Sequence, residues 1–280
     1  MSWPSRRPVA TVVAVAMTVR VGRGTDTKRV ERPDRWWLEP VAIVSGLGLF
    51  VLYSAWAGLA NAHYYSEPYL SPFYSPCITS SCPHVTFGVP FVGDWWGFSP
   101  AVFIIGFPLV FRLTCYYYRR SYYRGFFWAP PACTVPDARA TYAGETKFPF
   151  ILQNLHRYAW YLAVPIWVIL TYDAVLAYIF PAADHDGFRI GIGLGSLIMT
   201  ANIVLIGLYT FSCHSCRYLC GGYLDRFRGA PIRYRLWSAV NRLNARHGLY
   251  AWLSLFFVGL TDLYIRMVSM GWISDPRIIF

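Results

Sequence analysis

Charged side chains are scarce in this sequence. Only 14% of its 280 residues are Asp, Glu, Lys or Arg, whereas 56% are hydrophobic and 19% are aromatic. Soluble domains have about a quarter of their residues charged, because their surface must be hydrated. The shortage excludes an ordinary soluble domain and predicts that lipid covers much of the surface.

The sequence also lacks the features of nucleic-acid-binding proteins and of enzymes that catalyse hydrolysis with their own side chains. Its net charge of +11 does not indicate nucleic-acid binding, because the basic residues stand between long apolar runs and form no basic face. It has no glycine-rich phosphate loop and no plausible nucleophile and base for hydrolysis. We therefore expect no nucleic-acid partner, and any chemistry must come from a cofactor.

Long apolar runs dominate what is present. A helix needs about 20 mostly apolar residues to cross the hydrocarbon layer. Five stretches qualify: Trp37–Ala62, Phe98–Tyr118, Phe150–Phe180, Ile190–Ser212 and Gly248–Trp272. None shows the two-residue alternation of a barrel strand, so they are predicted to be helices. The sequence predicts an all-α, polytopic integral membrane protein: a basic cytoplasmic N-terminal arm, residues 1–36, and a five-transmembrane-helix domain, residues 37–280.

The basic residues alternate between the connecting segments. The segments before the first stretch, after the second and after the fourth each contain at least five Lys or Arg. Residues 63–97 contain none, and Arg189 is the only one between the third and fourth stretches. By the positive-inside rule, the N-terminus is predicted to be cytoplasmic and the C-terminus to lie outside.

This topology sorts the Cys and His residues into two groups. An inner group comprises Cys115, Cys133, His156, Cys213, His214, Cys216, Cys220 and His247, and an outer group comprises His63, Cys77, Cys82, His84 and His185. Four inner residues lie near the cytoplasmic ends of four different predicted helices: Cys115, His156, Cys213 and His247. We expect these four to meet at one depth in the bundle.

Several centres remain open for the inner group. Two thiols and two imidazoles suit tetrahedral zinc, and they equally suit a Rieske-type [2Fe–2S] centre. Alternatively, Cys213 and Cys216 share a helix face that Cys220 continues, with His214 pointing elsewhere. A b-type haem held by His156 and His247, or by His214 and one of these two, is a further alternative. In the simplest interpretation the cysteines are small packing residues and the histidines anchor helix ends.

The outer Cys77 and Cys82 lie on the oxidising side, which predicts a disulfide. A second site of two Cys and two His, with His63 and His84, is the alternative. Asp262 and Arg266, four residues apart in an apolar stretch, are predicted to pair, because an unpaired charge there is costly.

Basic and aromatic residues gather at the predicted cytoplasmic interface. Arg112 and Arg157 lie there with many tyrosines, and they could bound an opening for an amphipathic aromatic ligand. An ordinary interfacial belt of aromatic residues explains them equally well.

Several strings in the chain resemble a known family, the single membrane-anchor subunit of the actinobacterial, mycobacterial-type succinate dehydrogenase, a respiratory complex II. The strings are Tyr-Leu-Ser-Pro-Phe-Tyr-Ser-Pro (69–76), Arg-Leu-Thr-Cys-Tyr-Tyr-Tyr-Arg (112–119), Pro-Pro-Ala-Cys (130–133), Leu-Gln-Asn-Leu-His-Arg-Tyr (152–158), Cys-His-Ser-Cys-Arg (213–217) and Leu-Asn-Ala-Arg-His (243–247). The resemblance covers nearly all of the chain after the basic arm.

The resemblance implies an enzyme of three subunits in a bacterial plasma membrane. A flavoprotein subunit oxidises succinate, an iron–sulfur subunit carries the electrons, and this chain anchors both and presents a quinone, such as menaquinone. It also implies a membrane-embedded Rieske-type [2Fe–2S] cluster and no haem. We predict Cys115, His156, Cys213 and His247 as its ligands, with Cys216 and His214 as alternates. The predicted quinone-binding residues are Arg112, Arg157, Tyr158 and Trp160.

Two other functions are compatible with the pattern. One is a haem-b-binding anchor of another respiratory oxidoreductase. The other is a small transporter or metal-handling membrane protein, which should show inverted repeats or a broken central helix. We find no paired interruptions in the sequence.

Overall fold

The computed structural model describes residues 34–82, 86, 88, 90–93, 95–138, 146–148, 150–182, 187–222 and 226–280. Residues Trp36–Phe280 form one compact unit, to which the following description applies. The predicted arm, residues 1–36, lies almost entirely outside the described residues, as do His84 and His185.

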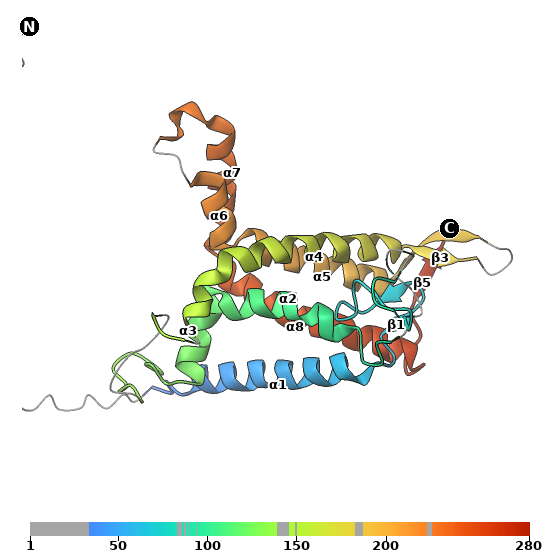
Figure 1. The fold of residues 1–280 in the computed structure, drawn as a ribbon, viewed down its shortest axis with the longest axis horizontal. Coiled ribbons are helices and arrows are strands. Elements are labelled where there is room, and N and C mark those ends of the chain that lie inside the picture. The colour runs from blue at the N-terminus through green and yellow to red at the C-terminus, as the bar shows by residue number, and fades with distance from the viewer. Residues whose placement is uncertain are drawn as a thin grey trace, which may run out of the picture. The chain divides into compact units, whose positions relative to one another are not determined.

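Long helices that run alongside one another form the unit, as Figure 1 shows. Four spans are long and apolar enough to cross a membrane: α1 (Leu38–Ala60), a 3₁₀ helix (Phe150–Leu155) continued by α4 (His156–Leu176), α5 (Leu194–Phe211) and α8 (His247–Ser269). The pair α2 (Ala101–Thr114) and α3 (Tyr116–Gly125) passes the same test together, although it is bent by 77°. The prediction of a helical membrane bundle is therefore confirmed for the described residues, and the predicted number of five spans is reached if the bent pair counts as one span.

The bend between α2 and α3 corrects one predicted boundary. The stretch Phe98–Tyr118 was predicted as one helix, but Cys115 has an extended backbone, with φ −64° and ψ 128°, and interrupts it. The residues of α3 are mostly Tyr and Arg. Such side chains favour the border between hydrocarbon and water, so α3 turns aside where the apolar stretch ends.

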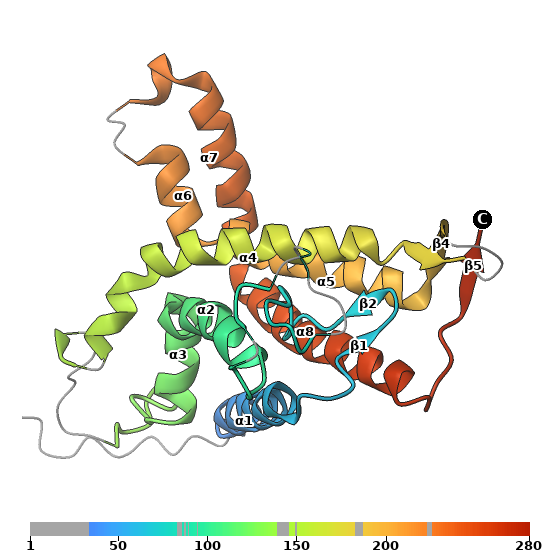
Figure 2. The same cartoon turned by 45° about the vertical axis from the view of Figure 1, so that its right-hand side comes forward.

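A similar turn follows α5. The sequence allowed one helix to continue past Phe211 through Cys220, whereas α5 ends at Phe211 and a separate helix, α6 (His214–Gly221), begins after Cys213. With the 3₁₀ turn Phe227–Gly229 and α7 (Pro231–Asn244), α6 forms a hairpin that projects sideways from the bundle (Figures 1 and 2). We call the end of the bundle that carries α3 and this hairpin the basic end.

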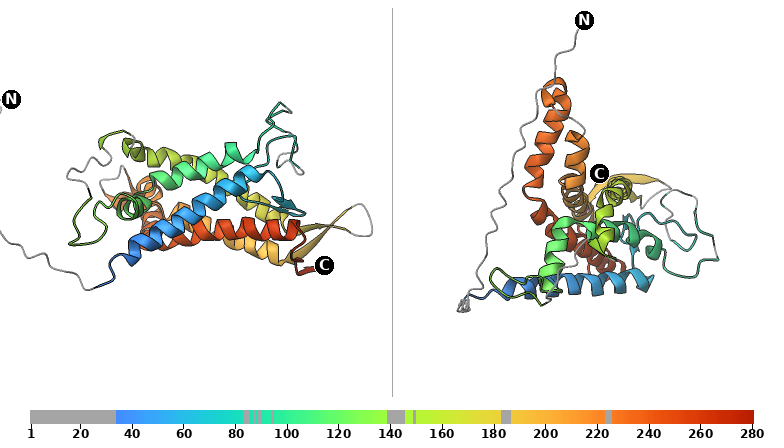
Figure 3. Two further views of the ribbon diagram at one scale, coloured as in Figure 1. Left: turned by 90° about the horizontal axis from the view of Figure 1, so that it is seen from below. Right: turned by 60° about the vertical axis from the view of Figure 1, so that its left-hand side comes forward.

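The opposite end is built from short strands and loops. Strands β1 (Tyr65–Ser66) and β2 (Tyr69–Leu70) form a hairpin, and β3 (Ile179–Pro181), β4 (Phe188–Gly193) and β5 (Arg277–Ile279) form an antiparallel sheet in that order. Residues 179–180 and 190–193 were predicted as helix ends. They are strands instead, because β3 and β4 pair as a hairpin and β4 also pairs with β5, which is distant in the sequence. The chain ends beside this sheet, away from the start of α1 (Figures 1 and 3).

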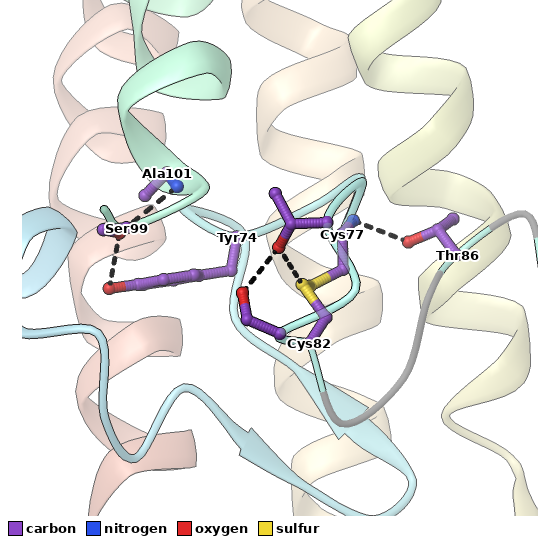
Figure 4. The surroundings of a disulfide bond; sticks show 8 residues. Tyr74, Cys77, Cys82, Thr86, Ser99 and Ala101 are labelled. Atoms are coloured by element: carbon purple, nitrogen blue, oxygen red, sulfur yellow. Dashed lines mark hydrogen bonds between the residues drawn. A yellow bond between two sulfur atoms is a disulfide. The ribbon is translucent and has the colours of Figure 1, made fainter. Parts of the chain in front are cut away.

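A disulfide joins Cys77 to Cys82 at this end, which confirms the predicted bond. Figure 4 shows the surrounding loop, in which the backbone N–H of Cys77 donates to Thr86 Oγ1 at 2.8 Å. Both thiols are used in the bond, so the alternative second metal site is wrong. We call this the disulfide end of the bundle.

The predicted pair of Asp262 and Arg266 is also confirmed. Arg266 Nε donates to Asp262 Oδ2 at 2.7 Å, and both side chains are buried. Asp262 also accepts hydrogen bonds from the hydroxyls of Tyr53 and Ser71, while Arg266 donates to two carbonyls at the end of α1. Full hydrogen bonding makes a buried charge pair tolerable, and it ties α8 to α1 and β2.

Candidate metal centre

The four predicted ligands meet at the basic end of the bundle. Nε2 of His156 lies 3.1 Å from Sγ of Cys213, and Nε2 of His247 lies 3.5 Å from Sγ of Cys115. All four side chains are buried. They come from four elements: the α2–α3 break, the start of α4, the α5–α6 turn and the start of α8.

A hydroxyl holds each histidine in place. Thr114 Oγ1 lies 2.8 Å from Nδ1 of His156, and Ser212 Oγ lies 2.7 Å from Nδ1 of His247. With Nδ1 occupied in this way, Nε2 of each ring faces a thiol. Metal-binding histidines characteristically engage their second ring nitrogen in such a bond, because it orients the ring and sets its tautomer.

The two halves of the site repeat one arrangement. Each cysteine directly follows a hydroxyl residue, Thr114 or Ser212, and lies four residues after an aromatic ring that stacks on a histidine. Phe111 stacks on His156 and Tyr209 stacks on His247, both with ring centroids 5.0 Å apart. The sequence analysis did not identify the four supporting residues, although they share a spacing: an aromatic residue four positions and a hydroxyl residue one position before each cysteine. They are Phe111, Thr114, Tyr209 and Ser212.

Cys213 occupies the N-cap position of α6, just beyond the end of α5. The backbone N–H of Ser215 donates to its sulfur at 3.4 Å. Burial nevertheless raises the pKa of the Cys213 thiol to about 12, an increase to which the nearby Cys115 also contributes. The free thiol is therefore neutral near pH 7, and metal binding would have to displace its proton.

The alternates Cys216 and His214 make other contacts. Cys216 lies beside Cys220, one turn along α6, and burial with this neighbour raises the pKa of its thiol to about 12. His214 interacts with Arg217 through Nδ1 at 3.2 Å. Because Cys213 precedes α6, it does not share a continuous helix with Cys216 as the local alternative required.

The arrangement of the four donors differs from that of a site for a single metal ion. Among the described residues, no group of three or more His, Cys, Asp or Glu side chains is arranged around a single ion. The four donors form two thiol–imidazole pairs instead, and the buried Tyr209 hydroxyl beside them has no hydrogen-bond partner among the residues that the structure describes. Two thiols and two imidazoles fit a binuclear iron–sulfur centre in kind and number.

An apolar cavity of about 410 Å³ begins next to this site and extends between α1, α2, α4, α5 and α8. Arg112 and Tyr209 line it, and the Arg112 guanidinium lies 4.7 Å from the Tyr209 ring centroid. Arg112 also donates to Tyr118 and Ser254, at 2.8 and 3.1 Å.

The structure separates the predicted quinone-binding residues. Arg112 lines the cavity, whereas Arg157, Tyr158 and Trp160 do not. Arg157 lies over the ring of Tyr218, Tyr158 is exposed, and Trp160 donates to the carbonyl of Thr210 at 2.9 Å.

Comparison with known proteins gives two matches. The family described as actinobacterial succinate dehydrogenase subunit SdhC matches residues 38–271. A chain of the structure titled "Mycobacterium smegmatis Sdh1 complex in the apo form" is 44% identical, and the match covers 92% of this chain and 97% of that one, with a TM-score of 0.82. No curated protein matches.

Proposed function

The chain belongs to the family of actinobacterial succinate dehydrogenase subunit SdhC, and from this premise we propose that it delivers electrons to a membrane quinone. In this proposal it anchors the flavoprotein and iron–sulfur subunits of the enzyme. It holds a Rieske-type [2Fe–2S] cluster with Cys115, His156, Cys213 and His247, and it binds a quinone, such as menaquinone. Succinate is oxidised by the partner flavoprotein and not by this chain.

The observation that carries the proposal is the meeting of two thiols and two imidazoles from four separate elements in one buried place. When bound, the cluster would supply one-electron transfer between the iron–sulfur subunit and the quinone. Thr114 and Ser212 hold the imidazoles with Nε2 inward. The stacked rings of Phe111 and Tyr209 cover the histidines and exclude water.

The apolar cavity supports the quinone part of the proposal. A membrane quinone has a polar head and a long hydrocarbon tail, and the cavity offers apolar walls that lead to Arg112 and Tyr209 beside the site. The guanidinium of Arg112 can donate a hydrogen bond to a quinone oxygen. Reduction also consumes protons, which the hydroxyl of Tyr209 or water bound at Arg112 can relay.

The partners would dock at the basic end. Arginines of α3 and of the α6–α7 hairpin gather there, and this excess of basic residues supports a cytoplasmic position for this end. The C-terminus then lies outside the plasma membrane. Electrons from a docked iron–sulfur subunit would enter close to the four proposed ligands.

The test is the double variant His156→Ala/His247→Ala in the whole complex. We expect it to oxidise succinate with a soluble dye as acceptor but to lose quinone reduction, because only the second reaction needs the membrane centre. Iron, acid-labile sulfide and the EPR signal of the cluster should fall together, and size-exclusion chromatography should show intact assembly.

Three results would contradict this proposal. Normal quinone reduction with an unchanged EPR signal in the double variant would refute the ligand assignment. Sharp α and Soret bands in a reduced-minus-oxidised spectrum of the native complex would indicate haem b instead. Zinc in place of iron and sulfide would leave the four residues as a structural site.

A further inference from the structure

A second cavity, of about 450 Å³, lies at the basic end on another side of the bundle. It is bounded by α1, α3 and α8, and it shares no lining residue with the apolar cavity. Its walls are Glu39, Ala42, Ile43, Tyr117, Arg120, Ser121, Arg124, Trp252 and Phe256. We call it the α3 groove.

The rim of the α3 groove carries positive charge. Arg120 and Arg124 are one turn apart on α3, which is bent by 77° from α2. Arg124 is neutralised by Glu39, whose two carboxylate oxygens each lie 3.0 Å from its Nη1. Arg120 is exposed and makes no hydrogen bond or ion pair with any described residue, so its charge remains available to a ligand.

The floor of the groove is hydrocarbon. Trp252 and Phe256 stack on each other along α8, with ring centroids 5.8 Å apart. Ile43 of α1 is buried beside the groove. Both helices are membrane spans, so this floor continues into the bilayer while the arginines stand at its border.

A cation above an apolar floor at the membrane border matches a molecule with an anionic head and an acyl tail. Guanidinium groups pair well with phosphate oxygens. We propose that the α3 groove binds one anionic phospholipid, with its phosphate at Arg120 and an acyl chain along Trp252 and Phe256. The proposal requires only that the chain spans a membrane, and it does not depend on the cluster or the quinone.

The head group, not the tail, must provide the selectivity. A lipid tail gains little by moving from other lipid onto Phe256, since both surroundings are apolar. Because one arginine is available to the head group, we expect the groove to enrich an anionic lipid about fivefold over a zwitterionic lipid. This enrichment corresponds to about 1 kcal/mol. Inorganic phosphate has no tail to align on the floor and should not compete at millimolar concentration.

Two single substitutions at the α3 groove should change lipid enrichment in opposite directions and so test the proposal. The whole complex would be placed in nanodiscs of phosphatidylglycerol and phosphatidylcholine, and the lipids it retains would be counted by native mass spectrometry. Arg120→Gln should abolish the enrichment of phosphatidylglycerol. Glu39→Gln should raise it about fivefold, because it releases Arg124 as a second available cation.

The matched control is Arg228→Gln, which removes an exposed arginine in the turn between α6 and α7. It should leave the enrichment unchanged. Equal lipid ratios in the Arg120 and Arg228 variants would overturn the proposal. So would loss of the bound lipid to inorganic phosphate, or a partner subunit found cross-linked inside the groove.

Discussion

At the scale of single residues, the site depends on side chains that would not themselves bind the metal. Ser212 and Thr114 each hold one imidazole through Nδ1. Without this bond an imidazole can rotate, and its Nε2 no longer faces the centre. The backbone of Ser212 is used as well, because its carbonyl accepts from Nδ2 of Asn244 at 2.8 Å.

We therefore expect Ser212→Ala combined with Thr114→Val to weaken cofactor retention by about 10- to 100-fold, the usual cost of losing such orienting bonds. Iron and acid-labile sulfide per chain, measured after dialysis against a chelator, report this loss. Thr171→Val is the control, because among the described residues the Thr171 hydroxyl bonds only to the carbonyl of Trp167, within α4. If both variants kept equal iron, the orienting role would be refuted.

Hydrogen bonds to single residues also explain why charged side chains are tolerated within the bundle at the disulfide end. An isolated arginine within the hydrocarbon layer costs several kcal/mol. Arg266 avoids this cost because Asp262 and the carbonyls of Ala57 and Ala62 take up its hydrogen bonds. The pair is thus a buried link between α8 and α1, and none of its described contacts reaches the candidate metal centre.

At the scale of elements, close helix packing depends on small residues, as is usual in membranes. A methyl group added to Gly207 of α5 would lie 2.8 Å from Nε1 of Trp167 on α4. That indole cannot easily move away, since it donates to the carbonyl of Ile203 at 2.9 Å and packs edge-on against Phe211.

Gly207→Ala should therefore lower the free energy of unfolding by about 1–3 kcal/mol, the usual cost of overpacking. Gly48→Ala in α1 is the matched control: nothing lies within 4 Å of its added methyl group, so alanine should be neutral or slightly stabilising. Thermal unfolding of the purified complex in mild detergent compares the two. Equal melting temperatures for the two variants would show that the added methyl group at position 207 does not overpack the contact between α4 and α5.

At the scale of the whole molecule, the two ends of the bundle differ in chemistry. The basic end carries the cysteines that form no disulfide, and the disulfide end carries the only disulfide among the described residues. This matches a reducing cytoplasm on one side and an oxidising exterior on the other. The distribution of cysteine chemistry thus supports the orientation inferred from the arginines.

Labelling from either side of the membrane tests this orientation. A membrane-impermeant maleimide should react with the exposed Cys133 only in inverted vesicles, and this labelling should disappear in Cys133→Ser. A Phe280→Cys variant, at the exposed C-terminus, should react only in intact spheroplasts. The reverse pattern would require the opposite orientation and would place the proposed docking end outside the cell.

The sequence alone determined the membrane class and the apolar stretches, because the bilayer selects segments by local composition, and it predicts the orientation of the chain. It also placed Cys115, His156, Cys213 and His247 at one depth, since depth follows from position within a span. The aromatic and hydroxyl residues that support them lie at recognisable spacings, but their roles depend on which histidine each one reaches.

Only the tertiary structure decided which thiol lies against which imidazole. Cys213 and His156 are 57 positions apart, and Cys115 and His247 are 132 apart, so neither pair leaves a local pattern. The breaks at Cys115 and Cys213, the pairing of β4 with β5 and the α3 groove likewise arise from contacts between distant segments. Composition sets how deep a residue lies in the bilayer, whereas helix packing sets which side chains it meets there.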